Sequence, residues 1–373
     1  MAYGKDQKIQ KFMKKDIVII GAGLTGLTLN YLIKKNTFLS SIYNIKIIEG
    51  RSRTGGRIHT IKKAKVDHTI EMGATWFGLK HNRFLSLLKE LEIQYFEQTI
   101  GKKAHYEPLS TSPPYLVDLP PNPEPSMRLQ GGTEIIIENL SQHILTKDLQ
   151  LNTIVKSIKK VGSSLSINTD RANYNADIVI STLPPNLFAS TIKVYPKLPA
   201  AFTSIAMATH TWMGESIKIA LTFEEPFWRN KNGSGTIFSN VGPIPEMYDH
   251  CNYKDDFYAL KGFFNGTYFS LSKKERLQKV LKQLEKYFGV KVYDYLSYEE
   301  AVWRKEHLTF IPYASHILPH QNNGHEVYHK SYLDNTLIIG GTETAKQFPG
   351  YMEGAVRSAE SIVEQLLHQN KDN

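Results

Sequence analysis

Three closely spaced glycines, Gly21, Gly23 and Gly26, are suited to holding a phosphate group. They follow the short apolar run 16–20, and apolar residues then recur at helical spacing over 24–34. Gly21 permits a tight turn, Gly23 lets a pyrophosphate approach backbone N–H groups, and Gly26 lets the helix pack against the strand. The pattern predicts a strand, a glycine turn and a helix that together bind phosphate.

An acid and two arginines follow this turn. A second apolar run, 45–48, ends at Glu49, where a carboxylate can accept hydrogen bonds from the ribose of a dinucleotide. Arg51 and Arg57 offer planar donor forks to ribose and phosphate oxygens, and Gly56 admits close backbone approach. The arrangement predicts a βαβ unit that binds a dinucleotide, and a coincidental glycine turn is the alternative.

A second segment with chemical potential, 340–355, joins a glycine turn, the carboxylate of Glu343, the aromatic Tyr351 and the start of a helix. Apolar spacing over 355–366 places the N-terminus of that helix near 350–352. Free N–H groups and the helix dipole favour negative charge there, as on the N1/C2 carbonyl side of a reduced flavin. The segment predicts a flavin contact. Taken alone, an ordinary αβ turn capped by glycines explains it equally well.

The remaining pattern predicts the elements that position these residues. We expect helices over 80–97, after Gly131-Gly132-Thr133 and over 272–288, and strands within 153–185, at 216–223, at 257–264 and at 337–340. The proline-rich stretch 113–125 is expected to have little regular structure. The prediction is a mixed α/β fold with a Rossmann-like dinucleotide-binding domain (14–79, 130–205 and 306–373) and a sheet-plus-helices substrate domain (80–129 and 206–305).

Composition limits the classes of function. The chain has 373 residues, 41% of them hydrophobic, which is enough for more than one domain. Its one cysteine, Cys251, excludes an internal disulfide, a cysteine-rich metal site and a redox cysteine pair, and it fits a reducing compartment. Residues 1–15 are expected to be a polar tail without the apolar region of a secretory signal. We therefore expect a cytoplasmic protein without a membrane span or a metal.

The net charge of +9 would suit a polyanionic partner if the basic residues were gathered together. The lysines are instead scattered in pairs, with no long basic tract interleaved with aromatic residues. We therefore expect no nucleic-acid partner.

Five separated segments, in order along most of the chain, resemble the flavin-containing monoamine oxidase family. They are the E-x-R-x-x-x-G-G-R run at 49–57, the stretch 71–78, the blocks 130–132 and 180–185, the pair 212–218 and 223–229, and the segment 340–355. The resemblance implies FAD as the cofactor, rather than a nicotinamide dinucleotide. The residues it assigns to the cofactor, together with those of the glycine turn, are Gly21, Gly23, Thr25, Gly26, Glu49, Arg51, Gly56, Arg57, Gly73, Ala74, Thr75, Val155, Trp303, Thr342, Glu343 and Met352.

The same resemblance implies three catalytic residues, Lys218, Tyr313 and Tyr351. The family places the lysine near flavin N5 through a water, where a cation would stabilise negative charge on oxygen. Lys218 also sits in an alternating strand, so a surface lysine is the alternative. The two tyrosines would form opposite walls of an aromatic cage that aligns a neutral amine, and core aromatics are the alternative for them. Tyr313 is placed by taking Trp303 as the anchor of a divergent stretch.

The sequence departs from the family at Pro312, where classical monoamine oxidases carry the cysteine that forms a thioether to the flavin. Cys251 is far away in the sequence, so we expect noncovalent FAD. The section between Gly78 and Gln130 is also shorter than in mammalian-type enzymes, and their membrane-anchoring tail is not found.

Together these features predict an FAD-dependent amine oxidase. An amine would be oxidised to an imine that hydrolyses to an aldehyde and ammonia, and oxygen would be reduced to hydrogen peroxide. A desaturase or isomerase of the same superfamily and a noncatalytic FAD-binding module are the open alternatives. A disulfide reductase or a nicotinamide dehydrogenase is disfavoured by the single cysteine and by the segments around Arg57 and Tyr351.

Overall fold

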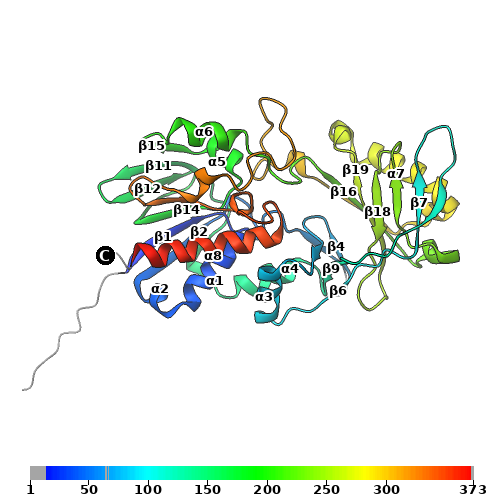
Figure 1. Cartoon of the computed structure of the whole chain (residues 1–373), viewed down its shortest axis with the longest axis horizontal. Helices are drawn as coiled ribbons and strands as arrows, with labels where there is room; N and C mark the ends of the chain where they lie inside the picture. The colour runs from blue at the N-terminus through cyan, green and yellow to red at the C-terminus, as the bar shows by residue number, and fades with distance from the viewer. Residues whose placement is uncertain (1–13, 64, 66, 371–373) are drawn as a thin grey trace, which may run out of the picture.

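The computed structural model describes residues 14–63, 65 and 67–370. The expected polar tail, residues 1–15, lies almost wholly outside this range. Figure 1 shows an elongated molecule with an α/β region at one end and a second large sheet, near α7, at the other. The last helix, which ends at Gln369, reaches the outer edge of the α/β region beside the start of the first strand (Figure 1).

The α/β region is built on a six-stranded sheet with the order β10-β2-β1-β14-β22-β21. Its strands are β1 (Lys15–Ile20), β2 (Tyr43–Ile48), β10 (Leu149–Gln150), β14 (Ile178–Ser181), β21 (Ser331–Tyr332) and β22 (Leu337–Ile339). All neighbours are parallel except β21 and β22. The expected βαβ unit is confirmed, because α1 (Leu24–Lys35) joins the parallel strands β1 and β2.

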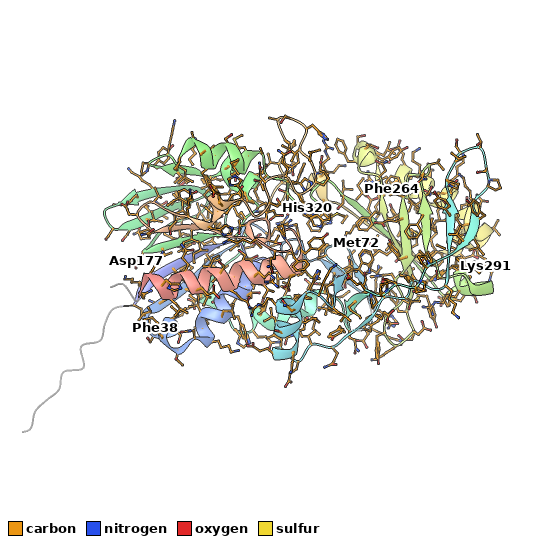
Figure 2. All side chains as sticks on the ribbon, viewed as in Figure 1. Phe38, Met72, Asp177, Phe264, Lys291 and His320 are labelled. Carbon is orange, nitrogen blue, oxygen red and sulfur yellow. The ribbon has the colours of Figure 1, made fainter. Side chains whose placement is uncertain are left out.

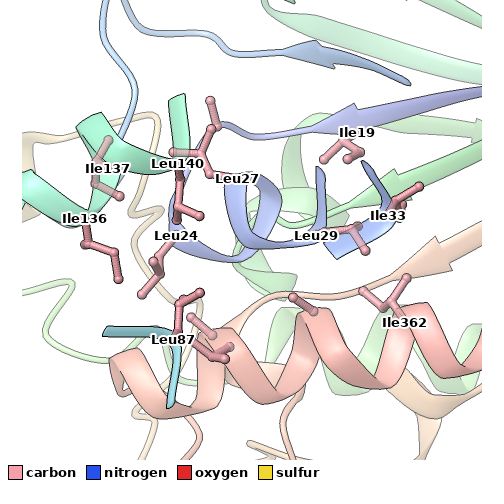
Figure 3. Packing of buried hydrophobic residues seen from close by; sticks show 14 of the residues in the cluster. Ile19, Leu24, Leu27, Leu29, Ile33, Leu87, Ile136, Ile137, Leu140 and Ile362 are labelled. Atoms are coloured by element: carbon pink, nitrogen blue, oxygen red, sulfur yellow. The ribbon is translucent and has the colours of Figure 1, made fainter. Parts of the chain in front are cut away.

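Helices cover one face of this sheet around a core in which Ile19, Leu27, Leu29, Ile33 and Ile362 are buried (Figure 3). Apolar residues of these strands and helices face one another because burying them removes apolar surface from water. The helices that contribute to this core are α1, α2 (Thr37–Ile42), α3 (Asn82–Glu90), α4 (Glu134–Ser141) and α8 (Met352–Gln369). The α8 helix packs against α1 and α3.

A second core lies on the opposite face of the same sheet, where Val18, Ile20 and Val179 point. It joins a four-stranded sheet and two short helices. These are β11 (Val155–Val161), β12 (Ser164–Thr169), β13 (Asn173–Ala176), β15 (Lys193–Tyr195), α5 (Pro185–Thr191) and α6 (Ala200–Met207). Alternation along β1 therefore supplies both cores, since successive side chains of a strand point to opposite faces.

The second large sheet has seven strands in the order β20-β16-β19-β18-β17-β7-β8. They are β7 (Lys103–Glu107), β8 (Tyr115–Asp118), β16 (Ile217–Phe223), β17 (Ile237–Ser239), β18 (Glu246–Asp249), β19 (Tyr258–Phe264) and β20 (Ser297–Val302). The amphipathic helix α7 (Lys273–Phe288) begins with a capping box between Ser272 and Glu275. It shares a core with Ile217, Ile219 and Leu221, so the residues that alternate with them face the other way.

Two expectations about local structure were wrong in part. The stretch 113–125 contains β8, which forms a hairpin with β7 because the four residues of β8 include no proline and can pair. The helix expected over 80–97 ends at Glu90, and β6 (Tyr95–Glu97) then pairs with β9 (Ser126–Leu129), which also pairs with β5 (Phe77–Gly78). A further small sheet pairs β3 (Thr60–Lys62) with β4 (Thr69–Glu71).

The proposed domain boundaries stay a prediction. Membership of the two large sheets agrees with them, since β7, β8 and β16 to β20 all fall in the ranges assigned to the substrate domain. The α3 helix also falls in that range, yet Phe84, Leu87 and Leu88 join the core of the α/β region. Packing therefore places α3 with the α/β region.

Candidate active site

A cavity of about 790 Å³ extends from the glycine turn after β1 to the open face of the seven-stranded sheet. Both regions contribute to its wall, and Met72 and His320 lie where they meet (Figure 2). Of the residues predicted from the sequence, the cavity is lined by Gly21, Gly23, Thr25, Glu49, Arg51, Gly56, Arg57, Gly73, Ala74, Thr75, Lys218, Trp303, Thr342, Tyr351 and Met352. Gly26, Val155, Tyr313 and Glu343 are not among the lining residues.

The glycine turn has no room for side chains at two positions. Gly21 has a φ of +105°, and a Cβ there would lie 2.7 Å from Thr182 Oγ1. A Cβ on Gly26 would lie 2.1 Å from the carbonyl oxygen of Gly21, so a glycine at this position lets α1 pack closely against the turn. The helix α1 begins after Gly23 without a side-chain cap, so its first N–H groups are free to bind an anion at the cavity.

Glu49 is held rigidly at the end of β2. Its carboxylate accepts hydrogen bonds from the backbone N–H groups of Ala22 and Arg51, at 2.8 and 2.9 Å, and the residue is 6% exposed. The Arg51 guanidinium donates to the carbonyl oxygen of Leu308 and to Thr309 Oγ1, at 3.2 and 2.7 Å. Arg51 thereby ties a distant segment of the chain to the wall beside Glu49.

Arg57 and Glu343 form a two-pronged ion pair. Nη1 and Nη2 of Arg57 donate to Oε1 and Oε2 of Glu343 at 2.5 and 2.8 Å. The Glu343 side chain is 0% exposed, whereas that of Arg57 is 23% exposed and reaches the cavity. Glu343 therefore acts on the cavity through Arg57, whose donor fork it orients.

The segment 72–75 is held by three side chains from the seven-stranded sheet and the turn that follows β20. Lys218 Nζ donates to the carbonyl oxygen of Gly73, Lys261 Nζ donates to Thr75 Oγ1, and Trp303 Nε1 donates to the carbonyl oxygen of Met72. Burial lowers the pKa of Lys218 to about 8. Burial, and then the charge of Lys218, lower the pKa of Lys261 as well. Sequence reasoning missed Lys261, although a lysine within the apolar run 258–264 was a signal for it.

The N-terminus of α8 faces the cavity through Gly350, Tyr351 and Met352. Gly350 has a φ of +87°, and a Cβ there would lie 2.7 Å from Trp212 Cβ. The Tyr351 ring lies 5.7 Å from that of Trp212 and 6.0 Å from that of His320, measured between ring centroids. Trp212 lines the cavity too, so it is an aromatic wall that sequence reasoning did not assign.

Two predicted residues lie behind the cavity wall. The Tyr313 hydroxyl accepts a hydrogen bond from the Thr211 backbone N–H at 2.7 Å, and its ring packs against Phe310 at 5.3 Å. Burial raises the pKa of this hydroxyl. Val155 begins β11 and is buried in the second core of the α/β region. The cage role of Tyr313 and the adenine contact of Val155 stay predictions.

A family model described as "Flavin containing amine oxidoreductase" matches residues 24–113 and 114–367, which is most of the chain. The chain belongs to this family. It is therefore a two-domain flavoprotein and an oxidoreductase that acts on amines. The five segments that suggested the monoamine oxidases thus led to the correct family.

Individual relatives of the family align along nearly the whole chain. A probable flavin-containing monoamine oxidase A of Dictyostelium discoideum is 24% identical over 94% of this chain and 97% of its own. The flavin-containing amine oxidase B of Homo sapiens is 23% identical over 95% of this chain and 86% of its own.

Two solved structures share the fold with a TM-score of 0.81. One is a putrescine oxidase bound to putrescine, which is 21% identical and aligns over 95% of this chain and 99% of its own. The other is a cyclohexylamine oxidase from Brevibacterium oxydans, which is 16% identical and aligns over 95% of this chain and all of its own.

The cavity of this family member fits a flavin dinucleotide. A glycine cradle without room for side chains, the uncapped start of α1 and a fixed acid lie at one end, and the N-terminus of α8 lies farther along. Both helix ends favour negative groups, as a pyrophosphate and a reduced flavin ring require. Among residues 14–63, 65 and 67–370, no helix has the length and apolarity needed to cross a membrane. In the same part of the chain, no cluster of three or more His, Cys, Asp or Glu side chains could hold a metal ion.

Proposed function

We propose that this chain is an FAD-dependent amine oxidase that uses oxygen as the electron acceptor and produces hydrogen peroxide. The amine becomes an imine, which water hydrolyses to an aldehyde and ammonia. One observation carries the proposal: a single cavity joins the dinucleotide cradle, the N-terminus of α8 and the buried Lys218. When bound, the flavin supplies the acceptor for a hydride equivalent from the carbon that bears the amine.

The protein's own residues orient the amine and exclude water. Tyr351 and Trp212 present aromatic rings at the cavity, and such faces align a neutral amine and tolerate its protonated form on entry. The flank of the cavity beside Lys218 is aromatic, since Trp76 and Phe263 also line it. Apolar walls keep water from the reacting carbon.

Lys218 would assist the reaction with oxygen. Its ammonium donates to the carbonyl oxygen of Gly73, and the residue as a whole is 5% exposed, at a part of the wall that the sequence assigned to the flavin. A preorganised cation in a water-poor site stabilises negative charge that develops on oxygen without a reorganisation cost. The N-terminus of α8 favours negative charge in the same way.

We further propose that FAD is bound without a covalent bond. No cysteine or histidine of the described residues lines the cavity. Cys251 lines a separate cavity of about 340 Å³, and burial raises the pKa of its thiol. The reducing compartment that suits this single thiol supports the cytoplasm as the location.

The test begins with the visible spectrum of the purified protein, followed by acid precipitation. We expect a yellow protein that releases its flavin into the supernatant, and flavin retained in the pellet would refute noncovalent binding. Peroxide production is then measured with primary, secondary and polyamines. A protein that binds FAD but yields no peroxide with any amine would be a noncatalytic module. Bleaching by a polyene alone would indicate a desaturase.

A further inference from the structure

The open face of the seven-stranded sheet carries a carboxylate that the proposed reaction does not use. Glu246 lines the cavity together with Lys218 and Phe263. The register aligns these three residues on adjacent strands, because Phe263 of β19 pairs with Lys218 of β16 on one side and with Glu246 of β18 on the other. Cross-strand partners point to the same face. Glu246 therefore stands two strand spacings from Lys218, about 10 Å between backbones.

Glu246 is not paired with either buried lysine. Lys218 donates to the carbonyl oxygen of Gly73 and Lys261 donates to Thr75 Oγ1, and the described residues include no ion pair between Glu246 and a cation. Its Oε2 accepts a hydrogen bond from the hydroxyl of Tyr248 at 2.8 Å. No group of the described residues donates a hydrogen bond to Oε1 of Glu246. The carboxylate therefore has one oxygen held in place and one open to a ligand.

Glu246 differs in this respect from Glu49, the other carboxylate among the described residues that line the cavity. The Glu49 oxygens are occupied by the backbone N–H groups of Ala22 and Arg51. Half-buried Glu246 interacts electrostatically with Lys218 but makes no direct ion pair with it, and a buried carboxylate is stabilised by a cation in direct contact. The cavity thus has one acidic position, far from the dinucleotide cradle, that is suited to a cation from outside.

Aromatic rings surround the same position. The ring of Tyr248 lies 5.4 Å from that of Trp76 and 6.2 Å from that of Phe238, and all three residues line the cavity. Burial and the charge of Glu246 raise the pKa of the Tyr248 hydroxyl, so this group stays a donor to the carboxylate. An ammonium beside a carboxylate and between aromatic faces is stabilised by both.

We propose that Glu246 binds the second, protonated amino group of a diamine or polyamine while the first amino group reacts. This inference rests on the proposed amine oxidase function and names its substrate class. The substrate would lie along the open face of the sheet, with the reacting nitrogen toward Tyr351 and the remote ammonium on Glu246. The methylene chain would pass over Phe263 and Trp76, where apolar contact suits it.

The experiment compares α,ω-diaminoalkanes, n-alkylamines of the same chain length and mono-N-acetylated diamines, which keep the length but lose the remote charge. We expect the wild-type holoprotein to have a kcat/KM for the diamine about ten-fold or more above that for the other two. E246Q keeps the size of the side chain and the bond from Tyr248. It should reduce the ratio of diamine to monoamine kcat/KM by about ten- to one-hundred-fold, as the loss of a charged hydrogen bond does.

E299Q is the matched control. Glu299 lies on β20 of the same sheet and pairs with Lys63 at 2.5 Å, and it does not line the cavity. This variant should keep the wild-type ratio. If monoamines are oxidised but E246Q leaves the ratio unchanged, the diamine inference fails and the amine oxidase function stands. If the holoprotein oxidises no amine, the function fails, and calorimetric titration then decides the subsite. Equal Kd values for diamine and monoamine would overturn it, and tighter diamine binding lost in E246Q would support it.

Discussion

The reaction of the reduced protein with oxygen should slow as Lys218 loses its proton. Its Nζ is buried over the rings of Phe263 and Trp76, at 5.1 and 5.9 Å from their centroids, and burial lowers its pKa to about 8. The cationic form is the one that can stabilise developing negative charge on oxygen. With a pKa near 8, the protonated fraction falls about ten-fold between pH 7 and pH 9. The rate constant for reoxidation by oxygen should fall by the same factor.

The assay isolates the oxidative half of the reaction. The holoprotein is reduced chemically without oxygen, mixed rapidly with oxygenated buffers across this pH range, and followed by the return of flavin absorbance. K218M should be slower than wild type at low pH and should show no dependence on pH in this window. The reductive half is measured separately, because its rate is expected to rise with pH as more of the amine is neutral.

K156M is the matched control, since Lys156 is an exposed lysine of β11. It removes the same charge and should follow the wild-type profile. A wild-type rate that does not change between pH 7 and pH 9 would refute the reasoning. A K218M protein that keeps the wild-type slope would refute it as well, because another group would then be responsible.

Three further predictions concern the cradle, the buried ion pair and stability. G26A should lose bound flavin, because its Cβ would lie 2.1 Å from the carbonyl oxygen of Gly21; a normal flavin content by absorbance would contradict this. E343Q should lower the free energy of unfolding, measured with urea, toward the low end of the roughly 3–5 kcal/mol that removing one partner of a buried pair costs. The low end is expected because the Arg57 side chain keeps 23% exposure, and E138Q in the exposed pair with Lys62 should cost less than about 1 kcal/mol. An E343Q loss no larger than that of E138Q would exclude the buried pair as a stabilising contact. The free energy of unfolding should also rise between about pH 8 and 10.5, because the unfolded chain then holds a proton that folded Lys218 has released. K218M should show a smaller rise, and an equal rise would assign the effect to other groups.

The dinucleotide part of the fold was predictable because its signals are local. The turn at Gly21, the start of α1 and the strand that ends at Glu49 lie within one βαβ unit, where spacing along the chain fixes spacing in space. The start of α8 at Met352 was predictable for the same reason. The helix expected over 80–97 was too long because β6 pairs with β9, a partner about thirty residues further on that helical periodicity cannot reveal.

By itself the sequence determined the glycine turn and the family, and it singled out Lys218 and Tyr351, which both line the cavity. Only the tertiary structure decided which residues share the substrate end of the cavity. The register of three strands brings together Lys218, Phe263 and Glu246. Trp76, from the loop between β4 and β5, packs against Phe263. Tertiary packing likewise put Trp212 next to Tyr351 and left Tyr313 behind the wall. Hydrogen bonding between strands and the exclusion of water from the core set these contacts. Neither can be predicted from the spacing of residues along the sequence.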